Sequence, residues 1–132
     1  MVRELIKAYC IGGAEDRALA LLTTAHGLYG VTPTAMCYEP ILFNYAVLKA
    51  LPDVTEDVLM MLINRGVGLT DCIVDSLVLC HIRHNELPEA LDRIVDCFNM
   101  HGVRPTTNTV LRFIHCILHY TPYTIHYTLY TL

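Results

Sequence analysis

The chain has 132 residues, of which 54% are hydrophobic and 17% charged, a composition typical of a single domain with a substantial core and not of a disordered chain. No apolar run approaches the roughly 20 residues of a membrane-spanning helix, so we expect no insertion into a membrane. Nine Lys and Arg against 13 Asp and Glu give a net charge of −4, which lacks the overall basic balance of most nucleic-acid-binding proteins but is compatible with a local basic face.

The first 34 residues predict a pair of helices. Apolar residues at helical spacing indicate a helix over 2–10, which Gly12-Gly13 ends because glycine readily adopts the left-handed conformation that closes a helix. Asp16 marks the start of a second helix, where a carboxylate suits the free backbone amides. This helix is expected to run to about residue 28.

The second and third units repeat this plan. We expect first helices from near Ala35 and over 72–83, and a second helix in each unit that follows a Leu-Pro-acid triplet. Proline is tolerated in a first helical turn, because its missing N–H would have no helical partner there. The second helices are expected to end near residue 65 and at Gly102.

A fourth first helix is expected over 108–119, and no second helix follows it in the sequence. Residues 120–132 instead alternate Tyr and Thr, so we expect a low-complexity, poorly ordered tail. The first unit also lacks its opening residues. These features are compatible with an internal start, a piece of a longer array or a truncated gene product, and in each case the fourth unit would expose apolar surface.

One signature organises the chain. Gly30, Gly66 and Gly102 each open a pentapeptide that ends in Thr, and each copy lies 36 residues after the one before. Self-similarity at a fixed period between about 20 and 50 residues is typical of a repeat solenoid. Apolar columns follow the same period: Leu5/Ile41/Leu77/Phe113, Ile6/Leu42/Val78/Ile114, Leu22/Val58/Ile94 and Ala18/Val54/Ala90. Such columns arise when the same position of every unit packs on its neighbours.

These residues resemble the pentatricopeptide repeat family. The resemblance rests on LIKAYCIGG over 5–13, RAL over 17–19 and GVTPT over 30–34, and on EAL over 89–91 with GVRP over 102–105. It covers about residues 1–119 and implies an all-α fold, a right-handed α-solenoid of helix-turn-helix repeats. The units are about 1–34, 35–70, 71–106 and a partial unit over 107–119.

The resemblance also implies a function. In this family the first helices line a concave groove that binds single-stranded RNA, usually in mitochondria or plastids, with one base read per repeat. The implied base-contacting pairs are Arg3 with Thr34, Glu39 with Thr70, and Asp75 with Thr106. A phosphate-binding position of the family maps to Ile11, Val47, Arg83 and His119, of which Arg83 is reliably positive.

The helix position of these pairs departs from the family pattern, which has a small neutral Asn, Thr or Ser. Glu39 and Asp75 place carboxylates there, and an unpaired carboxylate is costly to desolvate beside an anionic strand. The sequence therefore leaves two functions open. One is an adaptor that binds single-stranded or ribosomal RNA in a mitochondrion. The other is a protein-interaction scaffold or structural subunit of a mitochondrial ribosome or RNA-processing complex, without base reading.

Other residue patterns suggest chemistry less strongly. His115, Cys116 and His119 lie on one expected helix, and part of this set recurs one unit earlier, so a zinc site between the two helices is one interpretation. Packing is the favoured one, because the cysteine column also holds Ala8 and Asn44. The six cysteines form no CxxC pair, and we expect free thiols.

No catalytic motif is present. The chain contains no GxSxG, HExxH, P-loop or GxGxxG sequence. We therefore expect a protein that is not an enzyme, with no catalytic residue, no metal and no cofactor. Near Met1 there is neither a signal peptide nor an Arg-rich presequence, so the mitochondrial location is an expectation from the resemblance alone.

Overall fold

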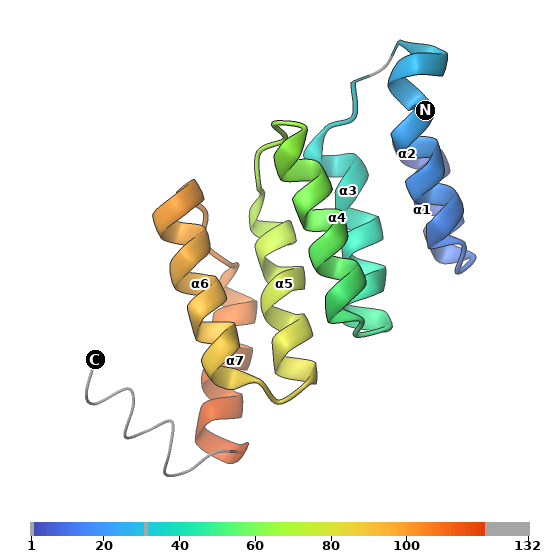
Figure 1. Ribbon diagram of the computed structural model, residues 1–132. Helices are drawn as coiled ribbons and strands as arrows, with labels where there is room; N and C mark the ends of the chain where they lie inside the picture. The colour runs from blue at the N-terminus through green and yellow to red at the C-terminus, as the bar shows by residue number, and fades with distance from the viewer. Residues whose placement is uncertain (1, 31, 121–132) are drawn as a thin grey trace.

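A computed structural model of the protein describes residues 2–30 and 32–120, without the side chains of residues 26–29 and 120. This part of the chain folds into seven α-helices and one π-helical turn, with no strand (Figure 1). The helices are α1 (Val2–Ile11), α2 (Glu15–Tyr29), α3 (Ala35–Phe43) with the π-helical turn η1 (Asn44–Leu48), α4 (Pro52–Asn64), α5 (Asp71–Arg83), α6 (Leu87–His101) and α7 (Thr107–Tyr120).

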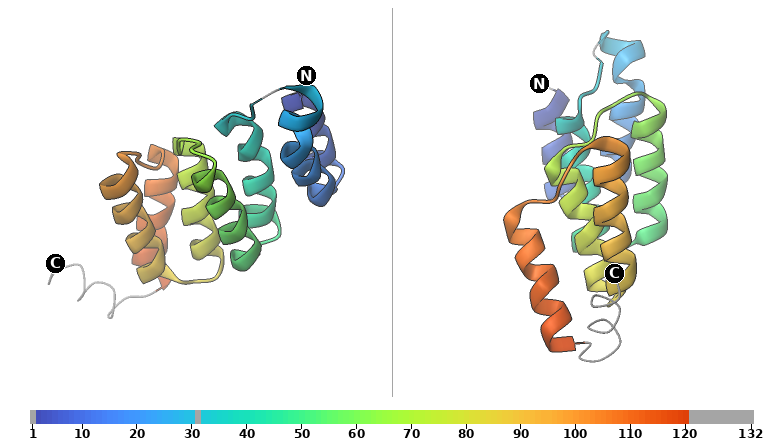
Figure 2. Two further views of the ribbon diagram at one scale, coloured as in Figure 1. Left: turned by 45° about the horizontal axis from the view of Figure 1, so that its top comes forward. Right: turned by 90° about the vertical axis from the view of Figure 1, so that its left-hand side faces the viewer.

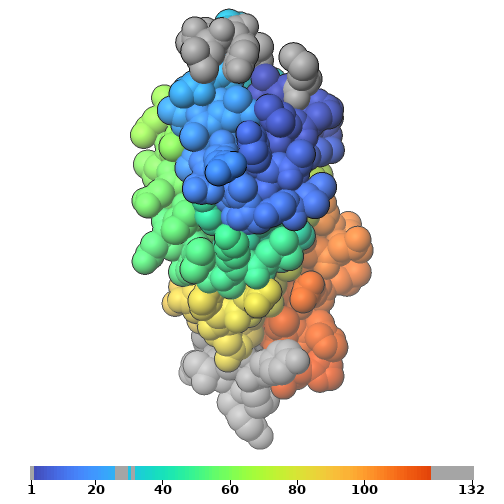
Figure 3. All heavy atoms as spheres, turned by 90° about the vertical axis from the view of Figure 1, so that its right-hand side faces the viewer, coloured from blue at the N-terminus to red at the C-terminus, as the bar shows by residue number. Residues whose placement is uncertain are grey.

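The helices form hairpins that stack in chain order. Within a unit α1 packs on α2, α3 on α4, and α5 on α6, while between units α1 packs on α3, α3 on α5, and α5 on α7. The first helices therefore lie along one side of the stack (Figure 2), and the space-filling view from the α1 end shows the units one behind another (Figure 3). The all-helical solenoid expected from the period of 36 is confirmed.

The repeated signature is a helix stop followed by a helix start. Gly30, Gly66 and Gly102 have φ of +64°, +73° and +69°, the left-handed conformation that closes a helix and that favours glycine. The threonine at the end of the signature precedes the next first helix. In the second copy, Thr70 Oγ1 accepts a hydrogen bond of 3.3 Å from the backbone N–H of Ile73 and so caps α5.

The apolar columns lie in the core, with one exception at each end of the array. In the first column Leu5 is 44% exposed whereas the later members are buried, and in the second column Ile114 is 44% exposed whereas the earlier members are buried. Leu5 therefore belongs to a column that faces the preceding unit, and Ile114 to one that faces the following unit. The expectation that every member faces inward is wrong at these two positions, because no described unit covers them.

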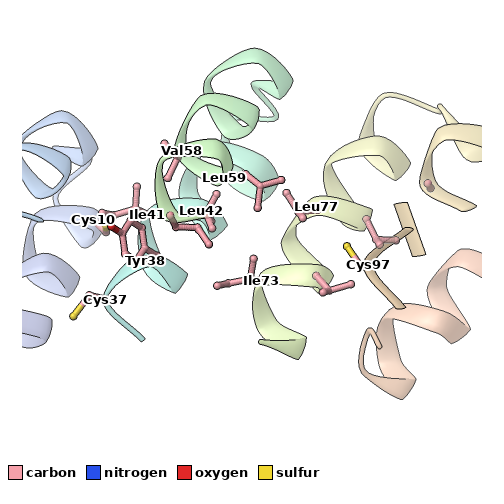
Figure 4. Packing of buried hydrophobic residues seen from close by; sticks show 14 of the residues in the cluster. Cys10, Cys37, Tyr38, Ile41, Leu42, Val58, Leu59, Ile73, Leu77 and Cys97 are labelled. Carbon is pink, nitrogen blue, oxygen red and sulfur yellow. The ribbon is translucent and has the colours of Figure 1, made fainter. Parts of the chain in front are cut away.

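The core is continuous from unit to unit. Leu59 on α4 and Leu77 on α5 point toward one another across the junction of the second and third units (Figure 4). Tyr38 on α3 is fully buried, and its hydroxyl oxygen accepts a hydrogen bond of 3.1 Å from Arg65 Nη1. The side chains therefore tie each hairpin to the next, as the repeat pattern predicts.

The sequence did not predict the π-helical turn. Within η1 the backbone widens, and the N–H of Lys49 donates to the carbonyl of Asn44 at 2.9 Å, five residues back. At this turn the buried Asn44 amide donates to the carbonyl of Cys10 at 2.7 Å and to Glu15 Oε1 at 3.0 Å. The turn thus presents a polar side chain to the first unit.

Glu15 is a buried carboxylate that joins the first two units. Lys49 Nζ lies 2.7 Å from its Oε2. Burial by itself raises the pKa of the Glu15 carboxyl, but the hydrogen bonds from Lys49 and Asn44 outweigh it, so the pKa lies below its usual value. The bond to Glu15 raises the pKa of the Lys49 ammonium. Both groups are therefore charged at neutral pH.

The Tyr–Thr tail over residues 120–132 lies outside the described residues, apart from the backbone of Tyr120, which ends α7. Within residues 2–30 and 32–120, none of the helices has the length and apolar composition needed to cross a lipid bilayer.

Candidate functional site

The expected groove along the first helices is present. An open groove of about 690 Å³ runs along α1, α3 and α5. Much of its lining is apolar, and Met36 and Phe43 from α3 are exposed there. Its charged side chains are Arg3, Lys7, Glu39 and Asp75.

Two of the three predicted base-contacting pairs are brought together, and their members bond to each other. Thr70 Oγ1 donates to Glu39 Oε1 at 2.8 Å. One unit later, the N–H and the Oγ1 of Thr106 donate to Oδ1 and Oδ2 of Asp75 at 2.8 and 2.7 Å. Each carboxylate therefore ties its first helix to the N-terminus of the next one, and the donors of these two threonines point at the protein.

The third predicted pair is different. Arg3 lines the groove, and Thr34 is exposed with its Oγ1 4.0 Å from the sulfur of Cys37. The structure shows no hydrogen bond between Arg3 and Thr34, both of which are described residues. The same repeat position thus holds a cation in the first unit and hydrogen-bonded carboxylates in the second and third.

Arg83 also contacts the protein. Its Nη1 donates to the carbonyl of Val47 at 2.8 Å, and the neighbouring His84 has Nε2 2.6 Å from the carbonyl of Ala50. Val47 and Ala50 lie in and just after η1, where carbonyls have no helical donor. Arg83 therefore caps the end of the preceding first helix. Ile11 and His119, at the same repeat position, are exposed.

Sequence reasoning missed Lys7 as a groove residue. Lys7 follows Arg3 by one helical turn and lines the same groove, so this i, i+4 spacing was the available signal. Among the aromatic candidates for stacking on bases, Phe43 is exposed in the groove, whereas Tyr9 and Tyr45 are partly buried against the core. Two cations and one aromatic ring therefore face the α1–α3 end of the groove.

The histidine and cysteine candidates for zinc do not converge. His115 and His119 stack with ring centroids 4.2 Å apart, and residues 2–30 and 32–120 contain no group of three or more side chains placed to hold a metal ion. Burial raises the pKa of the Cys80 thiol, which disfavours the thiolate that a metal needs. The arrangement fits packing.

Comparisons with known proteins agree with this architecture. The family model described as "Pentatricopeptide repeat-containing protein" matches residues 35–132. The crystal structure of the pentatricopeptide repeat protein PPR10 from maize superimposes with a TM-score of 0.71 at 17% sequence identity, over 88% of this chain and 16% of that chain. At this identity the likeness concerns the fold, and this chain spans about a sixth of the maize protein. No curated protein matches the chain.

Proposed function

Because this chain belongs to the family of pentatricopeptide repeat-containing proteins, we propose that it is an RNA-associated adaptor that binds single-stranded or ribosomal RNA in mitochondrial RNA processing, stability or translation. The observation that carries this proposal is the groove along the stacked first helices, with Arg3 and Lys7 on its lining. Arginine and lysine neutralise phosphates, and an exposed aromatic ring such as Phe43 gives a base a surface for stacking.

The charges of the groove restrict where RNA would lie. Arg3 and Lys7 come from α1, whereas Glu39 and Asp75 come from α3 and α5. A phosphate is attracted at the α1 end and repelled along the rest. The proposed contact is therefore a short anchor over α1 and α3, without base reading at every unit.

A pair of charge reversals tests the anchor. Lys7→Glu reverses an exposed charge in the groove, and Arg17→Glu reverses an exposed charge on α2, away from it. Binding of fluorescent homopolymeric RNA is measured by anisotropy over a series of salt concentrations. We expect Lys7→Glu to weaken binding and to reduce the slope of log K against log salt by about 0.7, the contribution of one phosphate contact.

The control decides how the result is interpreted. Arg17→Glu is expected to leave the slope nearly unchanged, because its effect on the groove is screened over more than a Debye length of about 10 Å at 0.1 M salt. Equal losses for both variants would indicate a general charge effect. Failure of the unaltered protein to bind RNA at low ionic strength would contradict the proposal.

A second function is supported by the groove's lining. The exposed apolar side chains of Met36 and Phe43 suit a protein surface better than a phosphate backbone, and the two carboxylates already accept hydrogen bonds from threonines. A protein scaffold in a mitochondrial ribosome or RNA-processing complex would use this lining. Co-purification of such proteins that is lost with Phe43→Asp, in a chain that does not bind RNA, would favour this function.

The mitochondrial location is part of the proposal, and the family resemblance supports it. It is tested by imaging a tagged chain against a mitochondrial marker and by protease protection of isolated mitochondria. A diffuse cytosolic distribution would contradict it.

A further inference from the structure

The end of the array formed by α6 and α7 leaves apolar side chains uncovered. In Figure 2, right, this end faces the viewer, and no described helix lies in front of α6 and α7. Leu59 and Leu62 of α4 are 3% and 0% exposed, whereas Val95 and Phe98, which lie 36 residues later on α6, are 46% and 44% exposed. The same repeat positions are therefore buried in one unit and open in the next.

The difference between these two environments identifies what would cover the open side chains. The unit of α4 is followed by a complete hairpin, α5 and α6, whereas the unit of α6 is followed by α7 alone among the described helices. The first helix of the following unit is present in both cases. The extra exposure of Val95 and Phe98 thus marks the place of a second helix.

The α7 side of this face agrees. Val78 on α5 is fully buried, and Ile114, at the same position of α7, is exposed. Leu111, Ile114 and Leu118 are all exposed and are spaced i, i+3 and i+7, which aligns them along one face of α7. A helix lying beside α7 would cover this stripe as α6 covers α5.

A salt bridge fixes the charge and the register of such a helix. On α6, Arg93 Nη2 lies 2.7 Å from Glu56 Oε2 of α4, so successive second helices are joined by a cation reaching back to a carboxylate. Asp92 stands 36 residues after Glu56 and is exposed on α6. It occupies the acceptor position for a cation on the next helix.

We propose that the face formed by Val95, Phe98, Ile114 and Leu118 binds an amphipathic helix of a partner protein. The helix lies beside α6 in the position of a further second helix, with its apolar stripe on these four side chains. A basic side chain in its first half pairs with Asp92. The interface continues the contacts that already join the units of this protein, and it does not depend on RNA binding in the groove.

The sequence of α6 supplies a defined probe. A synthetic peptide of residues 87–101, with Cys97→Ser to prevent disulfide formation, carries the apolar stripe and the arginine that make these contacts one unit earlier. Titration of the labelled peptide with the full chain, followed by anisotropy, is expected to show saturable binding. The same composition in scrambled order is the control peptide.

Two substitutions in the face test where the peptide binds. Phe98→Asp and Ile114→Asp are each expected to weaken binding by about tenfold or more, because each places a charge in an apolar contact. Met60→Asp is the matched control. Met60 is also exposed, and its counterpart one unit later is Asp96, so this position tolerates a carboxylate. Thermal unfolding of each variant shows that the fold is retained.

A charge exchange tests the register. Asp92→Arg in the protein is expected to weaken binding of the arginine-containing peptide by about twofold to fivefold, as for a solvated ion pair. A peptide carrying Arg93→Glu should then bind the Asp92→Arg protein better than it binds the unaltered protein. If the effects of the two substitutions only add, the proposed register is wrong.

Three outcomes would overturn the proposal. One is that the peptide fails to bind the full chain and all its variants. Another is that it binds only after Ile125→Asp and Leu129→Asp, which would mean that the chain's own residues 121–132 occupy the face. The third is concentration-dependent self-association that Phe98→Asp abolishes, which would identify a second copy of this chain as the occupant.

Discussion

Thr70 and Thr106 each perform two tasks. Each residue precedes a first helix, and each donates its hydroxyl to a carboxylate on the first helix of the preceding unit, 31 residues back. The sequence indicated which residues would meet, through the family resemblance, but not that they would bond to each other. A carboxylate at such a distance along the chain becomes a partner only through the stacking of units, which no local pattern encodes.

Replacing Thr106 by valine tests this double role. Thr106→Val removes the hydroxyl that donates to Asp75 Oδ2 while keeping the shape of the side chain and the backbone N–H bond. We expect the free energy of unfolding to fall by about 1–2 kcal/mol, measured by urea denaturation. Thr106→Ser retains the hydroxyl and should lose much less. Equal losses for the two variants would show that the methyl group matters and the hydrogen bond does not.

Among the helices, the start and stop signals of the sequence were reliable where the signal is local. Gly66 and Gly102 end their helices as expected, and the helix predicted over 72–83 is observed as Asp71–Arg83. The π-helical turn at Asn44 was missed because its cause is not local. The Asn44 amide meets Cys10 and Glu15 of another unit, so the widened turn depends on tertiary contacts.

Two glycines of one connection allow a matched comparison. Gly66 has φ of +73°, whereas the φ of Gly68 lies outside the left-handed region, and a methyl group at either position would meet no atom within 4 Å. Gly66→Ala is therefore expected to lower the free energy of unfolding by about 1 kcal/mol through backbone strain. Gly68→Ala should be neutral or slightly stabilising, because it reduces the freedom of the unfolded chain. Similar losses at both positions in thermal unfolding would contradict this explanation.

For the whole molecule, the position of a residue along the stack decides how much its side chain contributes. Leu5 and Leu77 share one column, but Leu77 is buried between two units and Leu5 is not. Leu77→Ala is expected to cost about 2–5 kcal/mol, the usual range for a buried leucine. Leu5→Ala should cost less than about 1 kcal/mol. The two denaturation midpoints check this, and a comparable cost at Leu5 would show that its exposed side is covered in solution.

The solenoid and the groove were predictable because one period repeats across the chain, and a repeated sequence specifies a repeated packing geometry. Which charges of the groove are free was not predictable. Arg83 has the composition of a phosphate ligand, but the carbonyl of Val47 occupies its guanidinium. Lys7 was overlooked because no family position pointed to it.

The succession of Arg3, Glu39 and Asp75 at one repeat position has a consequence for movement. A uniform polyanion that slid along the groove by one unit would exchange an attractive site for a repulsive one. The energy therefore rises with each step away from α1, and lateral diffusion along the protein is opposed. A strand held here would be docked at one position, like a mooring, instead of being scanned.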